Sequence, residues 1–277
     1  MSASDPQPPS FFAALRHVNV AKEHEIERRL RAQAVRALAQ RVEQALRLRN
    51  LPVRPQFRTV VRTPAPPRTR ALGLLLDALH WRRARRLPTG ESPSALVILS
   101  GGVGCGKSAA GCWIVARWPG NALRVSALDI AEMPETRWGE IAELREQWMT
   151  VELLLLDDVG MERERARLVA ERISGLLQRR YEEGRLTFVT TNRTAEAFTT
   201  LYLTTYGDVV DGTTERTALR GTARMASRLS NEQLGQGGLP YFHDLSGEPD
   251  YRDPDYRSRL DTLPRVTDAD LDAFLVS

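Results

Sequence analysis

The chain has 277 residues, of which 42% are hydrophobic and 27% are charged, and its formal net charge is +4. These values are those of an ordinary globular protein with one large domain, or with a core domain and an extension. No run of about 18 apolar residues occurs, so a membrane span is not expected. The first ten residues lack the pattern of a signal peptide, which makes the cytoplasm the expected location.

The charge is divided unevenly along the chain. Residues 1–90 carry 18 Arg and Lys against 6 Asp and Glu, whereas residues 91–277 carry 21 against 29. A basic front half joined to an acidic remainder predicts that the front half meets an anionic partner, and nucleic acid is the first candidate.

The first predicted element in chain order is one long helix from about Val20 to Asn50. Its apolar residues recur at a spacing of four, and arginines occupy the other faces: Ile26, Leu30, Ala34, Leu38, Val42 and Leu46 against Arg28, Arg29, Arg31, Arg36, Arg41, Arg47 and Arg49. Such a helix can dock on a partner helix, pair with itself, lie along DNA, or cover the rest of its own chain.

A proline-rich stretch, Leu51–Thr69, follows and is interpreted as a partly extended, semi-rigid linker. A short helix is then expected over Leu72–Arg86, with a basic cluster at its end. Two interpretations of this cluster stay open. It can contact phosphates while Trp81 stacks on a base, or it can simply place cations at a helix C-terminus.

Strands and helices alternate from residue 94 onward, and the expected strands are continuous apolar runs. This pattern predicts an α/β fold, in which a parallel sheet is covered by helices on both faces. The expected strands are Ala95–Ser100, Arg124–Leu128, Leu153–Leu156 and Leu186–Thr190, and the expected helices are Ala109–Trp118, Glu140–Met149 and Arg165–Glu183.

Residues 101–108 read G-x-x-x-x-G-K-S between the first of these strands and a helix, which is the context of a Walker A phosphate-binding loop. Backbone N–H groups of such a loop and the following helix start face a polyphosphate. Lys107 supplies a point charge, and the Ser108 hydroxyl is a candidate Mg²⁺ ligand. Only Lys22 and Lys107 are lysines among 39 basic residues, so a lysine stands where a planar guanidinium fits poorly. The candidate nucleotide-binding residues are Gly101, Gly102, Val103, Gly104, Cys105, Gly106, Lys107, Ser108 and Ala109.

The two cysteines, Cys105 and Cys112, lack metal-site spacing and are expected to be free thiols in a reducing compartment. Cys105 lies inside the phosphate loop. It is interpreted either as oxidation-sensitive or, more simply, as a small buried filler.

Two strand ends complete the candidate site. Four leucines run into Asp157 and Asp158, which is a Walker B pattern: Asp157 is expected in the Mg²⁺ shell, and Asp158 beside the attacking water. Asn192 follows the next strand and is a candidate to sense the γ-phosphate, or else a turn residue. Arg224 and Arg228 lie four apart on one helix face and could stabilise phosphoryl charge in a neighbouring subunit, or form a solvated face.

Together these segments resemble the AAA+ ATPases of the DnaC and IstB type. The resemblance rests on the Walker A loop, LLLLDDVG at 153–160, RRYEEGRLTFVTTNR at 179–193, RMASRL at 224–229 and PYFHDLSGEPDYR at 240–252. It implies that Asn192 is the first sensor and Arg228 the arginine finger, with Arg224 assisting. The expected organisation is a basic helical region at 1–51, a linker at 52–70, an AAA+ domain at 71–252 and a tail at 253–277. Only 25 residues follow Arg252, too few for a full helical lid.

The sequence therefore predicts an ATPase that uses ATP and Mg²⁺, assembles as a homo-oligomer on DNA, and acts on a protein partner. A helicase loader in DNA replication is the first hypothesis, and a transposition helper that serves a transposase is the second. The third is an ATP-gated protein adaptor that hydrolyses little ATP.

Overall fold

The computed structural model describes residues 25–26, 28–30, 32–33, 36–37, 40, 42–46, 49–51, 55–84, 95–132, 138–160, 166–203 and 242–270. The chain divides into two compact units, Met1–Arg41 and Val42–Ser277. The elements of the second unit are α2 (Pro55–Arg62), α3 (Arg70–Ala84), β1 (Ala95–Ser100), α4 (Lys107–Arg117), β2 (Ala122–Ser126), α5 (Ala127–Glu132), α6 (Trp138–Thr150), β3 (Leu153–Val159), α7 (Ala166–Glu182), β4 (Leu186–Thr191), α8 (Ala195–Leu203), β5 (Phe242–Asp244) and α10 (Pro254–Thr262).

In the first unit, the described residues from 25 to 40 are helical, as the spacing of apolar residues predicts. Ile26 and Leu30 on the predicted apolar stripe are 58% and 60% exposed. Arg28 and Arg29 lie 3.1 and 2.9 Å from the carboxylate of Glu25, pairs that suit adjacent turns of a helix.

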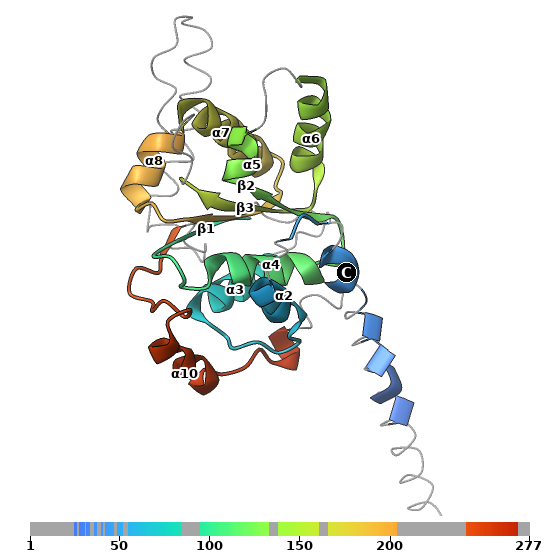
Figure 1. Ribbon diagram of the computed structural model, residues 1–277. Helices are drawn as coiled ribbons and strands as arrows, with labels where there is room; N and C mark the ends of the chain where they lie inside the picture. The colour runs from blue at the N-terminus through green and yellow to red at the C-terminus, as the bar shows by residue number, and fades with distance from the viewer. Residues whose placement is uncertain are drawn as a thin grey trace, which may run out of the picture. The chain divides into compact units, whose positions relative to one another are not determined.

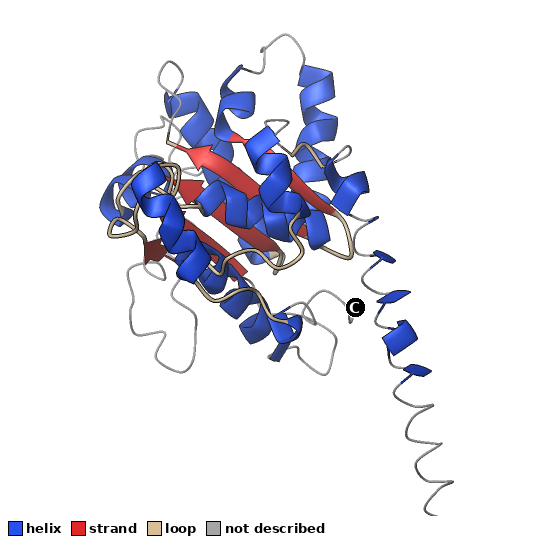
Figure 2. Cartoon of the chain, turned by 60° about the horizontal axis from the view of Figure 1, so that its bottom comes forward, coloured by secondary structure: helices blue, strands red, loops and turns tan. Residues whose placement is uncertain are grey.

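The second unit is built on one sheet of five parallel strands in the order β2-β3-β4-β1-β5 (Figure 2). The predicted α/β class and the parallel sheet are confirmed. β5 pairs with β1 from Ile98–Phe242 to Ser100–Asp244, so residues 242–244 of the segment at 240–252 add a strand beside β1. Parallel strands bring all their carboxyl ends to one edge, which is where ligands bind in such folds.

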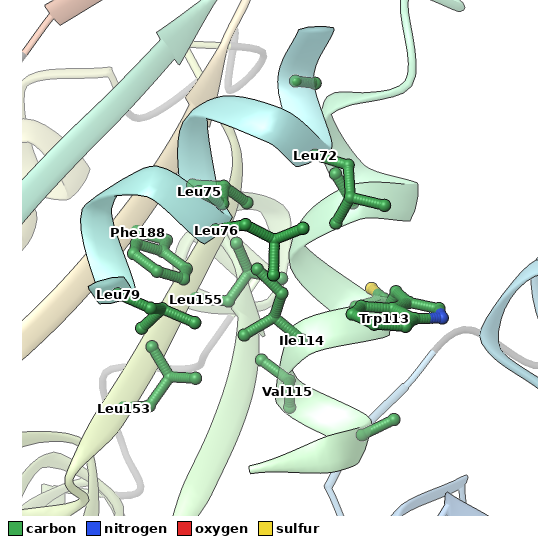
Figure 3. Close-up of a cluster of buried hydrophobic side chains, with 14 of the residues drawn as sticks. Leu72, Leu75, Leu76, Leu79, Trp113, Ile114, Val115, Leu153, Leu155 and Phe188 are labelled. Atoms are coloured by element: carbon green, nitrogen blue, oxygen red, sulfur yellow. The ribbon is translucent and has the colours of Figure 1, made fainter. Parts of the chain in front are cut away.

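Helices cover both faces of this sheet, with α2, α3 and α4 on one side and α5, α6, α7 and α8 on the other (Figure 1). The strands alternate between two buried clusters: Val97 and Leu99 belong to the first, and Leu96 and Ile98 to the second. Figure 3 shows part of the first cluster, in which leucines of α3 lie close to Trp113 and Ile114 of α4, together with Leu155 of β3 and Phe188 of β4. Burial on both faces explains why these strands are uniformly apolar in sequence.

The prediction of an extended linker over Leu51–Thr69 is wrong in its middle, because Pro55–Arg62 form helix α2. Pro55 is the first helical residue, and Pro64, Pro66 and Pro67 follow the last one, so none of them interrupts the helix. The segment is fixed to α4: the guanidinium of Arg117 donates to the carbonyl oxygens of Val61 and Thr63, both at 2.9 Å. The Trp113 indole also donates to Thr63 O at 2.9 Å.

The residues expected as a C-terminal tail form α10 and then return to the segment before α3. Arg68 N–H donates to Pro264 O at 2.7 Å, and Val266 N–H donates to Pro66 O at 3.0 Å. Asp253 caps the start of α10, because its side chain accepts a hydrogen bond from the Asp255 N–H. Pro254 follows it at the first helical position, which proline favours.

Arg180 of α7 is fully buried and ties three elements together at the edge of the sheet away from the phosphate loop. Its guanidinium donates to carbonyl oxygens in the last turn of α6, just after α6 and at the start of β4, and to the Thr187 hydroxyl at 2.9 Å. Burial lowers the pKa of Arg180 to about 9. The group stays charged at neutral pH and is compensated by main-chain dipoles.

Candidate nucleotide-binding site

The phosphate loop joins β1 to α4 at the carboxyl edge of the sheet. Gly104 and Gly106 have φ angles of 87° and 89°, a region that glycine enters without strain. A Cβ on Gly104 would clash with Oδ1 of Asp250, so a larger residue would have to displace that side chain as well as adopt a positive φ. Gly106 precedes α4 without any side-chain cap, which leaves the first N–H groups of this helix to face an anion.

Lys107 is buried, with 5% of its surface exposed, and its ammonium group lies inside the loop. Nζ donates to Gly101 O at 2.7 Å, to Gly102 O at 2.8 Å and to Asn192 Oδ1 at 3.1 Å. These partners carry no charge, so the ammonium adds a positive charge to a loop already lined by N–H groups. The structure thus brings together Lys107 and Asn192, which the sequence pattern assigned to one site from positions 85 residues apart.

Asp157 is the second fixed charge of the site. Only 1% of the residue is exposed. Arg124 of β2 donates from Nε to Oδ2 at 2.9 Å, and its Nη2 also lies 2.9 Å from that oxygen in an ion pair. The Thr190 hydroxyl of β4 donates to Oδ1 at 2.6 Å. Strands on both sides of β3 therefore hold this carboxylate, which a buried anion requires.

Asp158 differs from Asp157 in its exposure and its backbone conformation. The residue is more exposed than Asp157 although its carboxyl group is partly buried, and its backbone φ is 58°. Burial and then the charge of Asp157 raise its pKa, while the cations of Arg124 and Lys107 oppose this shift. That Lys107 acts on Asp158 indicates that the loop cation and the strand-end carboxylates share one local field. A carboxylate with a raised pKa accepts a proton more readily than an ordinary aspartate.

Three residues that hold the candidate site were not predicted from the sequence. Arg124 is the one charged residue in the apolar segment that forms β2. A lone charge in a buried strand indicates that an opposite charge lies close to it. Thr190 looked like any strand threonine. Tyr251 lies far along the chain, and its N–H donates to Gly104 O at 3.1 Å, which fixes the outer side of the loop. Beside it, hydrogen bonds from Arg252 lower the pKa of Asp250 to about 2.

The residues present fit a magnesium–triphosphate. An ionised carboxylate has about four acceptor positions, and Asp157 accepts one hydrogen bond from Arg124 and one from Thr190, which leaves acceptor capacity for a metal-bound water. Ser108 stands at the second position of α4, where its hydroxyl can join the same shell. Cys112 is a free, buried thiol whose pKa is raised well above its ordinary value by burial and by the charge of Asp157. Cys105 is also free and buried.

Two predicted site residues, Arg224 and Arg228, lie outside the described residues. Their roles therefore stay predictions.

No family model matches the chain, and no curated protein matches it either. The chain does match solved structures. The replication initiator DnaA bound to AMPPCP and single-stranded DNA is 18% identical, with 80% of this chain and 60% of that chain covered and a TM-score of 0.43. DnaI is 18% identical, with 73% and 93% covered and a TM-score of 0.40. Pif1 of Bacteroides sp in complex with ADP-AlF4 is 15% identical, with 74% and 48% covered and a TM-score of 0.33.

The chain spans only 54% and 60% of the first two replication proteins that it matches. At this identity the likeness concerns the general fold alone. Among the described residues, no helix combines the length and the apolar character that crossing a bilayer demands.

Replacing Asp158 with Asn tests the electrostatics of the strand end. The raised pKa means that the ionised carboxylate costs folding free energy, a cost absent at a pH below the ordinary carboxylate pKa and present above it. We expect Asp158→Asn to raise Tm by roughly 1–3 °C at pH 7 and to change it little at pH 3.5. Calorimetry at the two pH values measures this difference.

Asp261 of α10 provides the matched control, because its side chain is 82% exposed. We expect Asp261→Asn to leave Tm at pH 7 unchanged within a degree or to lower it slightly. An equal loss of stability at pH 7 in both variants would contradict the assigned repulsion between Asp157 and Asp158.

Proposed function

We propose that the chain is an AAA+ ATPase that binds ATP with Mg²⁺ and hydrolyses it to remodel a partner on DNA. The observation that supports this most is the contact between Lys107 Nζ and Asn192 Oδ1 beside the carboxylates of Asp157 and Asp158. A cationic loop, an acidic strand end and a polar strand end meet there at one edge of the sheet. This is the set of groups that phosphoryl transfer needs.

Each side chain has a defined task in this proposal. The N–H groups of residues 101–109 and the ammonium of Lys107 hold the phosphates, for which the ammonium exchanges its carbonyl partners. Mg²⁺, when bound, neutralises charge on the β- and γ-phosphate oxygens. Asp157 and Ser108 hold its shell, Asp158 orients the attacking water and takes its proton, and Asn192 contacts the γ-phosphate or that water.

Arg228, assisted by Arg224, completes the site of a neighbouring subunit, so hydrolysis depends on a homo-oligomer. This step rests on the resemblance of residues 224–229 to the family segment that bears an arginine finger. An arginine that contacts the transferring phosphoryl group contributes about 10³–10⁵ to the rate.

Helicase loading in DNA replication is the partner function that we favour, by the same resemblance. The basic front half supplies a surface for DNA, single-stranded in this proposal. The transposition helper uses the same ATPase and DNA contacts with a transposase as partner. A neighbouring helicase or transposase gene distinguishes the two. The adaptor hypothesis needs neither hydrolysis nor DNA.

Lys107→Ala removes the ammonium from the phosphate loop, and we expect ATP binding to fall by at least about 100-fold, since a charged hydrogen bond in a buried site is lost. Equilibrium binding of a fluorescent ATP analogue measures this. Lys22→Ala removes the other lysine of the chain and serves as a control that should bind the analogue normally. Retention of wild-type affinity by Lys107→Ala would refute the nucleotide site.

Arg228→Ala should retain ATP binding and lose turnover by about 10³-fold, because an arginine finger acts on the transition state formed in a neighbouring site. Steady-state hydrolysis at saturating ATP, combined with the binding assay, separates the two effects. Arg224→Ala is the paired variant and should lose less. A normal rate for Arg228→Ala with a large loss for Arg224→Ala would transfer the role to Arg224.

The DNA proposal predicts salt-sensitive binding. Contacts between arginines and phosphates release counterions, so affinity for a single-stranded oligonucleotide should fall by at least tenfold between 50 and 200 mM salt, as expected for several phosphate contacts. Fluorescence anisotropy on the full chain, with ATP hydrolysis followed in parallel, measures both consequences. Absence of DNA binding together with unstimulated hydrolysis would favour the protein adaptor.

A further inference from the structure

The end of β3 contains a β-bulge formed by the two acidic residues. Leu156 pairs with Val189, and Val159 pairs with Thr191. Two residues of β3, Asp157 and Asp158, therefore oppose one residue of β4, Thr190. A bulge of this kind leaves one residue without a ladder partner and changes the direction of the side chains that follow.

The bulge places Asp158 at a φ of 58°, a region that aspartate tolerates better than most residues. In a regular strand, successive side chains point to opposite faces, and Asp158 would be directed away from the face that Asp157 occupies. The bulge removes this constraint. The relative direction of the two carboxylates thus depends on whatever stabilises the bulge.

One hydroxyl stabilises it on both sides. Thr190 Oγ1 donates to Asp157 Oδ1 at 2.6 Å and accepts from the Asp158 N–H at 2.9 Å. Thr190 is 1% exposed, so water is a poor substitute for either bond. The N–H group that the bulge releases from the ladder and the carboxylate that precedes it are satisfied by the same oxygen atom.

We propose that Thr190 is a positioning residue for ATP hydrolysis, which fixes the bulge so that the metal-side carboxylate of Asp157 and the water-side carboxylate of Asp158 keep their relative placement. The inference rests on the proposed ATPase function. Thr190 touches neither phosphate nor water in this scheme and acts through the two aspartates.

The chemistry of the position demands a hydroxyl. The group must donate to a carboxylate and accept from an amide at the same time, which Ser and Thr can do and Val cannot. Thr190→Val keeps the β-branched shape that suits a buried strand and removes only this function. Thr190→Ser keeps the hydroxyl and removes a methyl group.

Thr187 supplies the matched control. It is on the same strand, is 2% exposed, and accepts from Arg180 Nε at the opposite end of β4 from the phosphate loop. Thr187→Val therefore also removes a buried hydroxyl from β4 and destabilises the protein, while the bulge keeps its hydrogen bonds. It separates a general loss of stability from loss of positioning.

The experiment uses the full-length chain in two measurements. Amide hydrogen exchange of Asp158 should accelerate at least tenfold in Thr190→Val, because a lost hydrogen bond opens this amide, and should stay slow in Thr190→Ser and Thr187→Val. The turnover number for ATP should fall at least tenfold in Thr190→Val alone, with ATP affinity within about threefold of wild type, as expected when orientation of a catalytic group is lost.

The outcomes separate the inference from the function on which it rests. Unchanged exchange at Asp158 in Thr190→Val overturns the role of the hydroxyl, as does an equal loss of turnover in Thr187→Val or a failure of Thr190→Ser to retain activity. If the wild-type chain shows no hydrolysis while the exchange pattern is as expected, the hydroxyl holds the bulge but the ATPase function and the positioning role both fail.

Discussion

The buried carboxylate of Asp157 constrains the centre of the second unit. An isolated charge in a leucine-rich strand would cost many kcal/mol, so the chain must bring it partners. They come from both neighbouring strands, as Arg124 from β2 and Thr190 from β4. A shift of either strand by one residue would withdraw its partner and turn the wrong face to the core. The charge that serves the site therefore also specifies the alignment of three strands.

Strand β4 connects the two halves of the site. Thr190 reaches the aspartates of β3, and two residues later Asn192 reaches Lys107 in the phosphate loop. Thr190 lies in this strand and Asn192 directly after it, and Arg180 holds the N-terminal end of the strand through Thr187 and the Leu186 carbonyl. In the proposed reaction, a change at the phosphates would thus be transmitted to the metal-side carboxylate through only three residues of backbone.

The sequence predicts those elements and site residues whose pattern lies within one short segment of the chain. A phosphate loop needs its glycines and lysine in one short segment, and a buried strand needs only an apolar run, so β1 and the phosphate loop with Lys107 could be predicted. Arg124 and Thr190 could not be assigned, because their roles depend on strand register. Helix α2 was not predicted, because a high proline content suggests an extended segment. The helix forms because Pro55 is its first residue and no further proline occurs before it ends at Arg62.

Several of the many arginines stabilise the fold of the second unit. Arg49, Arg117 and Arg180 direct their guanidinium groups at main-chain carbonyl oxygens, where a planar donor with five N–H groups satisfies several helix or strand ends at once. Arg62 pairs with Glu43, and Arg68 with Asp77. Arg49, Arg62 and Arg68 are three of the 11 arginines in residues 42–90, so part of the positive charge counted there is committed to the fold. In the first unit, Arg28 and Arg29 pair with Glu25 in the same way, so a count of arginines overstates the charge that the front half can offer to DNA phosphates.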